Sequence, residues 1–234
     1  MGAEVSVIIP VFNKADFLAE CLDSVLGQTL KNLEVICVND ASEDHSAEIL
    51  RRYANRDDRL KVFHNRENMG PGPSRNKGIE AANGRFLRFV DADDLLPQQS
   101  TEILYSIAIK DNVEVVRGSL ALFRGMVHSS YDEVHAVPDM TRTQLSKAQS
   151  LWIPWWHTSY LISSKLIKKY QLIYQNLIRV EDPVFLAYVV VNAGSLSMTE
   201  QNVYLYITYQ KSSGSDGVTN QQVLDHLQNA LKTK

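Results

Sequence analysis

The first hundred residues alternate between short, unbroken apolar runs and stretches in which apolar residues return every three or four positions. The run at 5–10 is rich in β-branched residues, as is typical of a strand buried on both faces of a parallel sheet. Apolar residues at helical spacing follow it up to Leu26, with Asp16 placed to cap that helix. The same alternation predicts strands at 33–40, 60–65 and 84–94 and helices at 46–56 and 73–82. Four strands separated by helices favour a parallel sheet with right-handed crossovers.

The second half of the chain continues this alternation with more interruption. We expect a helix at 97–109, a strand at 113–119 and an irregular insertion at 120–156 that covers one edge of the sheet. A strand at 158–164 and a helix at 165–172 follow. Asp182 and Pro183 fit the cap and first residue of another helix, and strands at 195–200 and 203–210 close the sheet. The pattern predicts an α/β fold with a Rossmann-like, mainly parallel central sheet flanked by helices.

Length, composition and charge limit the number of domains, the expected partners and the cellular location of the protein. With 234 residues, 44% of them hydrophobic, the chain is long enough for one substantial core, and we expect one domain. The formal charge of −3 comes without a basic stripe, so nucleic acid is not an expected partner. Two cysteines in apolar settings, no signal sequence and no run of roughly 18 apolar residues predict a cytoplasmic protein. The amphipathic stretch 219–234 predicts a C-terminal helix, which is compatible with a further region after it.

The fourth predicted strand ends in the sequence DADD, which contains Asp91, Asp93 and Asp94. Ligands of an open parallel sheet bind beyond the carboxyl ends of its strands. Three carboxylates so close together repel one another unless a cation lies among them, and Mg²⁺ or Mn²⁺ suits such a group. The metal would also bridge a diphosphate and neutralise its charge. The alternative is that Asp93 and Asp94 only cap the next helix.

Other polar residues gather at the same predicted edge. Asp40 ends the second strand, where it can accept a hydrogen bond from an imide such as N3–H of uracil or can serve as a turn residue. Arg75 and Lys77, near a helix start, either contact phosphate oxygens or are solvated surface charges. The glycines of segment 70–78 do not follow the first strand, and Arg75 stands where a dinucleotide fingerprint needs its third glycine. An NAD enzyme is therefore disfavoured.

Four segments together resemble the family-2 glycosyltransferases, which share the GT-A fold. They are VSVIIPVFN from 5, ICVNDAS from 36, ENMGPGPSRNKGIEAANGRFLRFVDADD from 67 and VED from 180. The order and spacing of these segments, taken together, are specific. The resemblance is close over about the first hundred residues and looser as far as about Tyr209. The resemblance implies an inverting, metal-dependent transfer of a sugar from a nucleotide-diphosphate donor, by default a UDP-sugar, to an acceptor hydroxyl.

The resemblance also implies which residues bind the donor. The positions that match nucleotide or donor contacts are Pro10, Val11, Asn13, Asp40, Arg75 and Asp91. Among them, Asp40 would bind uracil or ribose, and Asp91 would meet hydroxyls of the ribose or sugar. Asp93 is the expected direct ligand of Mn²⁺ or Mg²⁺. Lys211, the cation of the late loop, is expected to contact the diphosphate.

The matching position for the general base is the pair Glu181 and Asp182. Such a carboxylate accepts the proton of the acceptor hydroxyl as that oxygen attacks the anomeric carbon. We prefer Asp182, with Glu181 as the alternative. Trp155, Trp156 and His157 lie where similar enzymes bind the acceptor, and aromatic faces stack on sugars, although tryptophans more often pack in a core.

The domain expected from these matches covers 1–218, with a nucleotide-binding half at about 1–97 and an acceptor-binding half at about 98–218. The Q-x-x-R-W motif and membrane helices of processive members are missing, so we expect a non-processive enzyme with a glycan or lipid-linked glycan acceptor. A C-terminal region would allow peripheral association with the cytoplasmic face of a membrane. A nucleotidyltransferase is a competing interpretation, but it needs a glycine-rich basic loop after the first strand. An inactive sugar-nucleotide-binding protein is another, against which the intact Asp93 and Asp182 argue.

Overall fold

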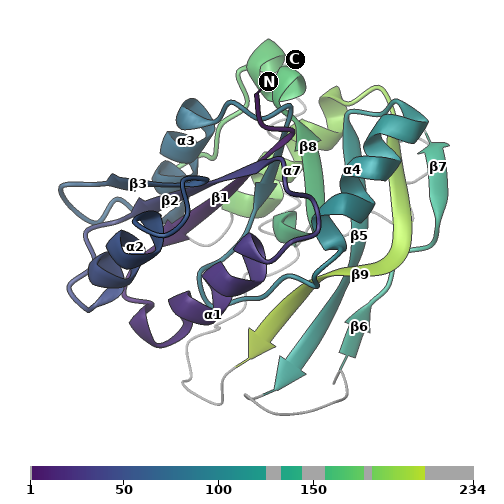
Figure 1. The fold of residues 1–234 in the computed structure, drawn as a ribbon. Helices are drawn as coiled ribbons and strands as arrows, with labels where there is room; N and C mark the ends of the chain where they lie inside the picture. Colours follow the sequence, from purple (N-terminus) through teal and green to yellow (C-terminus); the bar gives the residue numbers. More distant parts are fainter. Residues whose placement is uncertain (1, 125–132, 144–155, 177–180, 209–234) are drawn as a thin grey trace.

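The computed structural model describes residues 2–124, 133–143, 156–176 and 181–208 (Figure 1). Within these ranges the chain forms one sheet with strand order β3-β2-β1-β4-β8-β5-β9-β7, and β6 pairs with β5 outside that order. The strands are β1 (Val5–Val11), β2 (Leu33–Asn39), β3 (Leu60–His64), β4 (Phe86–Phe89), β5 (Val115–Arg124), β6 (Glu133–His135), β7 (Met140–Thr143), β8 (Tyr160–Ser163) and β9 (Leu196–Thr208). The helices are α1 (Ala15–Leu26), α2 (Ser46–Ala54), α3 (Pro71–Ala81), α4 (Ser100–Asp111), the short 3₁₀ helix η2 (His157–Ser159), α6 (Ser164–Tyr170) and α7 (Glu181–Asn192).

The strand directions confirm the mainly parallel sheet. Strands β1 to β5 and β9 run one way, whereas β6, β7 and β8 run the other way. Strand β1 pairs in parallel with both β2 and β4, and β2 pairs in parallel with β3. The carboxyl ends of the first four strands therefore lie at one edge of the sheet, where the sequence predicted a ligand site.

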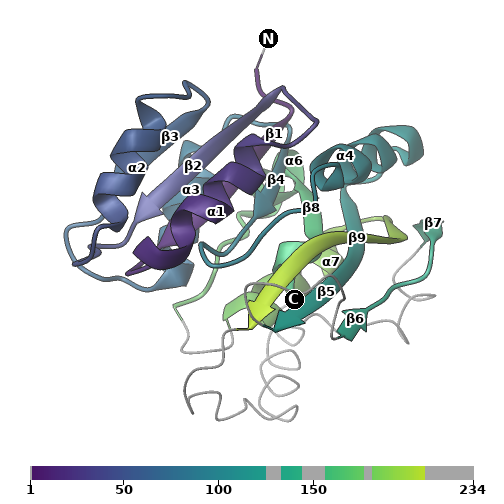
Figure 2. The same ribbon diagram turned by 60° about the horizontal axis from the view of Figure 1, so that its bottom comes forward.

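Helices cover both faces of the sheet (Figures 1 and 2). Helices α1, α2 and α4 pack on one face, where Leu22, Leu50 and Leu104 join one apolar core. Helices α3, α6 and α7 cover the other face, and Leu166 and Phe185 belong to the second core. All seven residues of β2 are buried, because helices cover this strand on both sides. None of the described helices has the length and apolar character needed to span a bilayer.

Helix α3 lies unusually close to β1, and Gly78 permits that approach. A Cβ atom at Gly78 would lie 2.4 Å from Ile8 Cγ2, which is well inside van der Waals contact. One turn earlier on the same helix is Arg75, which is buried. The close packing thus brings a guanidinium to the carboxyl ends of the central strands.

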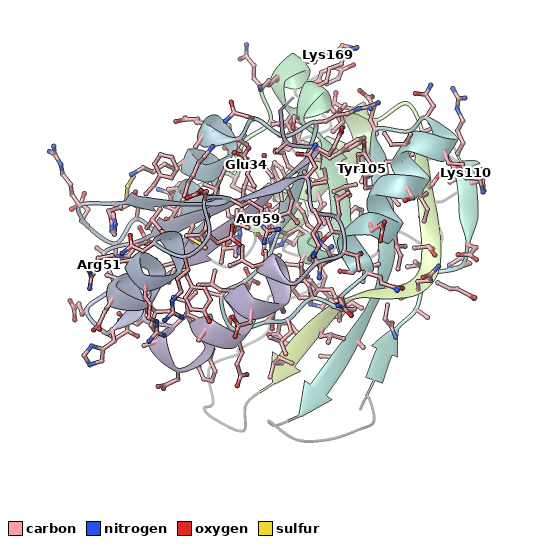
Figure 3. All side chains as sticks on the ribbon, in the orientation of Figure 1. Glu34, Arg51, Arg59, Tyr105, Lys110 and Lys169 are labelled. Carbon is pink, nitrogen blue, oxygen red and sulfur yellow. The ribbon has the colours of Figure 1, made fainter. Side chains whose placement is uncertain are left out.

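The amino ends of the strands are joined by Glu34, which is labelled in Figure 3. Its carboxylate accepts hydrogen bonds from Ser6 Oγ at 2.7 Å, Lys61 Nζ at 2.8 Å and the Asn83 amide at 2.7 Å. Burial raises the pKa of Glu34, but the bonds from Lys61 and Ser6 outweigh it and lower the pKa below its usual value. This anchor holds three neighbouring strands together at the end opposite the predicted site.

Several predicted boundaries are wrong, and the reasons are tertiary. The strand predicted at 84–94 ends at Phe89, and the helix expected from Pro97 begins at Ser100. The strands predicted at 195–200 and 203–210 form one continuous strand, β9, which adapts to β5 through register shifts. Region 120–156 is not wholly irregular, since β5 extends to Arg124 and β6 and β7 are strands. The last loop and the helix expected at 219–234 lie outside the described residues.

Candidate active site

A cavity of about 370 Å³, the strand-end pocket, opens at the carboxyl ends of β1, β2 and β4. Its lining includes six residues that the sequence predicted to bind donor or metal, namely Pro10, Val11, Asp40, Arg75, Asp91 and Asp93. The other lining residues are Phe12, Lys14, Asn68, Gly70, Pro71 and Ala92. Segments that are far apart in the sequence therefore meet at one pocket.

Asn13 lies beside this pocket and is not part of its lining. Its backbone is left-handed, with a φ of 51°, a conformation that Asn adopts more readily than most residues. Its Oδ1 accepts a hydrogen bond from the Glu43 amide at 2.8 Å, and its own amide donates to Ser42 Oγ at 3.1 Å. Asn13 joins the loops that follow β1 and β2, and a contact with the nucleotide stays a prediction.

Helix α1 starts at the pocket and is capped from another loop. The Ala15 amide donates to Asp44 Oδ2 at 2.9 Å, and the Lys14 amide donates to Ser46 Oγ at 3.0 Å. The prediction that Asp16 caps this helix is wrong, because Asp16 lies within its first turn. These contacts fix the backbone of Lys14 at the edge of the pocket.

Asp40 is almost completely buried and holds the loop before α3 in place. Its Oδ1 accepts hydrogen bonds from Asn65 Nδ2 at 2.6 Å and the Met69 amide at 3.0 Å, and its Oδ2 accepts one from the Gly70 amide at 2.8 Å. Gly70 has a φ of 89°, which a residue with a side chain would rarely adopt. A carboxylate has about four acceptor positions, so these three donors leave one for a ligand.

Lys77 supports the same loop. Its Nζ donates to the His64 carbonyl at 2.7 Å and to Asn65 Oδ1 at 2.9 Å. Lys77 is also outside the pocket lining. Lys77 is partly exposed and anchors the loop between β3 and α3, and a contact with phosphate stays a prediction.

Arg75 connects the residues that follow β4 with the start of α7. Its Nη2 lies 2.7 Å from Asp91 Oδ1 and its Nη1 lies 2.9 Å from Asp182 Oδ1. The guanidinium also lies over the ring of Tyr174, 5.3 Å from its centroid. Burial by itself lowers the pKa of Arg75, but Asp182 and Asp91 more than compensate and raise it. Arg75 is therefore a permanent cation between two carboxylates.

Asp182 is in the first turn of α7, one residue after the helix begins at Glu181, so it is not the cap residue that the sequence predicted. His157 Nδ1 lies 3.1 Å from Asp182 Oδ2, opposite the contact with Arg75. Burial raises the pKa of Asp182, but the charges of Arg75 and His157 outweigh it and lower the pKa to about 2. Asp182 is thus ionised throughout the neutral range.

Glu181 has the opposite electrostatic environment. Its Oε1 is 3.8 Å from Arg75 Nη1, and its side chain is 12% exposed, compared with 25% for Asp182. Burial and the negative charge of Asp182 raise the pKa of Glu181. Two adjacent carboxylates with pKa values displaced in opposite directions are a common arrangement in acid–base sites.

The three carboxylates of DADD have separate partners. Asp91 contacts Arg75, Asp93 Oδ2 lies 2.5 Å from Lys14 Nζ, and the buried Asp94 accepts hydrogen bonds from the Tyr204 hydroxyl at 2.7 Å and the Ile207 amide at 2.9 Å. The expectation that one cation lies among all three is therefore wrong. Among the residues that the structure describes, no three acidic, histidine or cysteine side chains are grouped so as to hold a metal.

The chemistry of Asp93 nevertheless fits the divalent cation that the resemblance implies. Its side chain is 29% exposed and lines the strand-end pocket. Mg²⁺ commonly binds through one or two carboxylates and completes its shell with substrate phosphates and water, without a cage made only of protein. Asp93 is the one DADD carboxylate that both faces the pocket and is bound by a flexible side chain.

The residues predicted to bind the acceptor lie in different environments where the structure describes them. His157 is buried, with its side chain 2% exposed, and it contacts Asp182 and packs against Phe89 with ring centroids 5.7 Å apart. His157 thus contacts the candidate base, and its contact with an acceptor stays a prediction. Trp156 packs, partly buried, against the first apolar core. Trp155 and Lys211 lie outside the described residues.

Lys14 and Tyr174 belong to this site but were not predicted from the sequence. Lys14 follows Asn13 directly in the loop after β1, and a cation in that loop was a signal that could have been used. Tyr174 stacks on Phe185 with ring centroids 3.9 Å apart and forms the surface beneath Arg75. No sequence pattern marks Tyr174, because its role depends on the segment after α6 contacting both Asn76 of α3 and Phe185 of α7.

The chain is similar in sequence to known glycosyltransferases. The family model described as "Glycosyl transferase family 2" matches residues 6–168, more than half of the chain. "Uncharacterized glycosyltransferase EpsJ" of Bacillus subtilis is 33% identical over 86% of this chain and 60% of its own length. "Cholesterol galactosyltransferase" of Borreliella burgdorferi is 30% identical over 89% of this chain and 60% of its own. "Poly(ribitol-phosphate) beta-glucosyltransferase" of Bacillus spizizenii is 28% identical over 87% of this chain and 32% of its own. The chain thus spans 60% or less of the length of these relatives.

Solved structures show the same fold. S. aureus TarS 1-349 in complex with UDP-GlcNAc superposes with a TM-score of 0.81 at 22% identity, over 98% of this chain and 66% of that one. The complex of TarS 1-349 with UDP gives a TM-score of 0.76 at 24% identity, over 88% of this chain and 60% of that one. The predicted α/β fold of the GT-A type is confirmed. On the match over residues 6–168, the chain belongs to glycosyl transferase family 2.

Proposed function

We propose that this protein transfers a sugar from a nucleotide-diphosphate donor, a UDP-sugar, to an acceptor hydroxyl, with inversion and one sugar at a time. The observation that carries the proposal is the position of Arg75, whose guanidinium contacts Asp91 on one side and Asp182 on the other. A donor-side carboxylate and a candidate base are thereby held in one rigid arrangement. Such preorganisation is what a displacement at an anomeric carbon requires.

The nucleotide binds in the strand-end pocket. Phe12 is 40% exposed in its lining and offers an aromatic face to the base, next to the walls formed by Pro10 and Val11. Asp40 has one acceptor position left, which suits the N3–H of uracil. Asp91 and Asp93 face the diphosphate and sugar end of the donor, and Lys211 keeps its predicted role at the diphosphate.

The reaction is a single displacement. The acceptor oxygen attacks the anomeric carbon and forms the new glycosidic bond, while the bond from that carbon to the diphosphate oxygen breaks. The bonding electrons leave with the nucleoside diphosphate, and attack from the opposite face inverts the configuration. The hydroxyl proton passes to Asp182, which its pKa of about 2 keeps ionised at neutral pH.

His157 has a positioning role in this scheme. Its Nδ1 contact fixes Asp182 Oδ2, while Arg75 fixes Oδ1, so the carboxylate has little freedom to rotate. Glu181 is the second candidate for the base, since its raised pKa makes it the stronger proton acceptor of the pair once it is ionised. The variants Asp182→Asn and Glu181→Gln separate the two candidates.

A divalent cation, Mn²⁺ or Mg²⁺, fits the pocket through Asp93 together with oxygens of the donor. When bound, it would neutralise the charge of the departing diphosphate. This chain contributes the partly exposed carboxylate of Asp93 and the fixed loop after β4 that holds it.

The related proteins named for a sterol and for a polymer of ribitol phosphate show that acceptors vary within the family. We propose a glycan or lipid-linked glycan acceptor, with Trp155 and Trp156 as its predicted contacts.

Calorimetric and thermal-shift titrations with UDP, UDP-sugars and GDP, each with Mn²⁺ or with a chelator, test the proposal. We expect the uridine compounds to bind, and to bind more tightly with Mn²⁺. Absence of binding by every nucleotide diphosphate would contradict it. Binding without UDP release in the presence of acceptors would favour an inactive binder. Pyrophosphate release from UTP and a sugar phosphate would favour a nucleotidyltransferase.

A further inference from the structure

Lys14 and Asp93 form an ion pair across the strand-end pocket. Lys14 Nζ lies 2.5 Å from Asp93 Oδ2, and the two side chains are 35% and 29% exposed. Lys14 comes from the loop before α1, whereas Asp93 comes from the loop after β4, and both residues line the pocket. The pair is therefore at the pocket surface, where a ligand can reach it.

Hydrogen bonds fix the backbone of Lys14, whereas its side chain is partly exposed and contacts Asp93. The Lys14 amide donates to Ser46 Oγ at 3.0 Å, and its carbonyl accepts the Phe17 and Leu18 amides at 3.0 Å and 2.9 Å. Among the residues that the structure describes, its ammonium has one partner, Asp93. An ammonium on a four-carbon stem can exchange that partner without any change in the fold.

The balance of charge in the pocket points to the same residue. Among the described residues of the lining, Arg75 and Lys14 are the cations, while Asp40, Asp91 and Asp93 are the carboxylates. Arg75 is already shared between Asp91 and Asp182. A diphosphate that enters the pocket adds negative charge beside these carboxylates, and Lys14 is the lining cation that can turn to meet it.

We propose that Lys14 is a diphosphate-binding residue that contacts Asp93 when no donor is bound and turns to a phosphate oxygen when the donor binds, which frees Asp93 for the divalent cation. This proposal rests on the proposed function. Without donor, Lys14 and the metal compete for one carboxylate. With donor, the diphosphate removes Lys14 from Asp93, so diphosphate and metal each strengthen the binding of the other, as linkage requires.

The variant Lys14→Met changes two affinities in opposite directions. In chelator, its affinity for UDP falls by about tenfold, because a charge-assisted hydrogen bond is lost, while its affinity for uridine is unchanged. Without nucleotide, its affinity for Mn²⁺, measured from the free-ion paramagnetic resonance signal, rises by about tenfold because the competing ammonium is gone. Lys14→Arg retains UDP binding in chelator. Lys31→Met is the matched control, since Lys31 Nζ bonds the Gln28 carbonyl at the other end of α1.

A second variant, Asp93→Asn, keeps the test independent of how Lys14→Met folds. It releases Lys14, so its UDP affinity in chelator rises above that of wild type, and the gain disappears in the double variant Lys14→Met/Asp93→Asn. Unchanged UDP affinity in Lys14→Met, or unchanged Mn²⁺ affinity without nucleotide, overturns the proposal for Lys14 and leaves the proposed function intact. A wild-type protein that binds no UDP under any condition overturns both.

Discussion

Arg75 Nη1 lies 2.9 Å from Asp182 Oδ1, although the two residues are 107 positions apart in the chain. The contact joins α3 to the start of α7, and the other end of the same guanidinium holds Asp91 after β4. One side chain thus sets the distance between the donor-side loop and the candidate base. The consequences for turnover, pH dependence and stability can be measured separately.

Replacing Asp182 by Asn preserves its shape but removes its ability to accept a proton. We expect turnover to fall by about 10²–10⁴-fold, with UDP affinity in the presence of Mn²⁺ nearly unchanged. Rates of UDP release with acceptor, measured beside calorimetric UDP affinity, check this. Glu181→Gln is the matched variant, and we expect it to keep most of its activity. Wild-type rates in Asp182→Asn together with loss of activity in Glu181→Gln would move the base to Glu181.

The pH–rate profile distinguishes the same two residues without mutation. With Asp182 as base, its pKa of about 2 leaves it ionised in any mildly acidic buffer, so kcat does not fall through loss of the base between neutral pH and about pH 4. With Glu181 as base, burial and the negative charge of Asp182 raise the pKa of the base. The acidic limb of the pH–rate profile then lies above the usual pKa range of a glutamate. The measurement is kcat against pH at saturating donor. An acidic limb that remains in Asp182→Asn but disappears in Glu181→Gln would contradict the assignment to Asp182.

The stability of the fold should depend on the ionisation of Asp182. Its folded pKa is lower than that of an unfolded aspartate, so its contribution is complete above about pH 4 and is lost as the pH falls towards about 2. We expect Asp182→Asn to remove about 2 kcal/mol of the pH-dependent free energy of unfolding in this window. Urea unfolding at a series of pH values measures it. Asp58→Asn, at an exposed carboxylate, serves as control, and equal slopes for wild type and Asp182→Asn would refute the expectation.

Removing the guanidinium of Arg75 should destabilise the protein through the carboxylates left behind. We expect Arg75→Met to lower the free energy of unfolding by about 2–3 kcal/mol, less than for a fully buried pair because both carboxylates keep some contact with solvent. In Arg75→Met/Asp182→Asn the loss should be smaller than the sum of the single losses. Urea denaturation of the four proteins completes the cycle. Strict additivity would mean that the two side chains do not stabilise each other.

Asp40 should affect the nucleotide site without affecting the metal. In Asp40→Asn an amide group replaces one carboxylate oxygen, so the hydrogen bonds to Asn65, Met69 and Gly70 cannot all form. We expect UDP affinity to fall by about tenfold, while the ratio of affinities with Mn²⁺ and with chelator stays at its wild-type value. Calorimetry under both conditions measures this ratio. Unchanged UDP affinity would limit Asp40 to its structural role in the loop before α3.

The sequence by itself determined the order of the elements and the edge of the sheet at which the site lies. Apolar runs such as residues 35–38 of β2 require cover on both faces, and helices between parallel strands supply it. Parallel strands place their carboxyl ends together, so the polar residues that follow β1, β2 and β4 had to share one edge. The motif set added the family, and the match over residues 6–168 confirmed it.

Only the tertiary structure decided which of these polar groups face the pocket and what each one contacts. Asp93 and Asp94 are adjacent in the sequence, yet Asp93 meets Lys14 in the pocket while Asp94 is buried against Tyr204. Likewise, His157 has no sequence feature that directs it to Asp182 rather than to a surface. The energy of a charged or polar side chain depends on burial and on partners distant in the chain, and local sequence patterns carry no information about those partners.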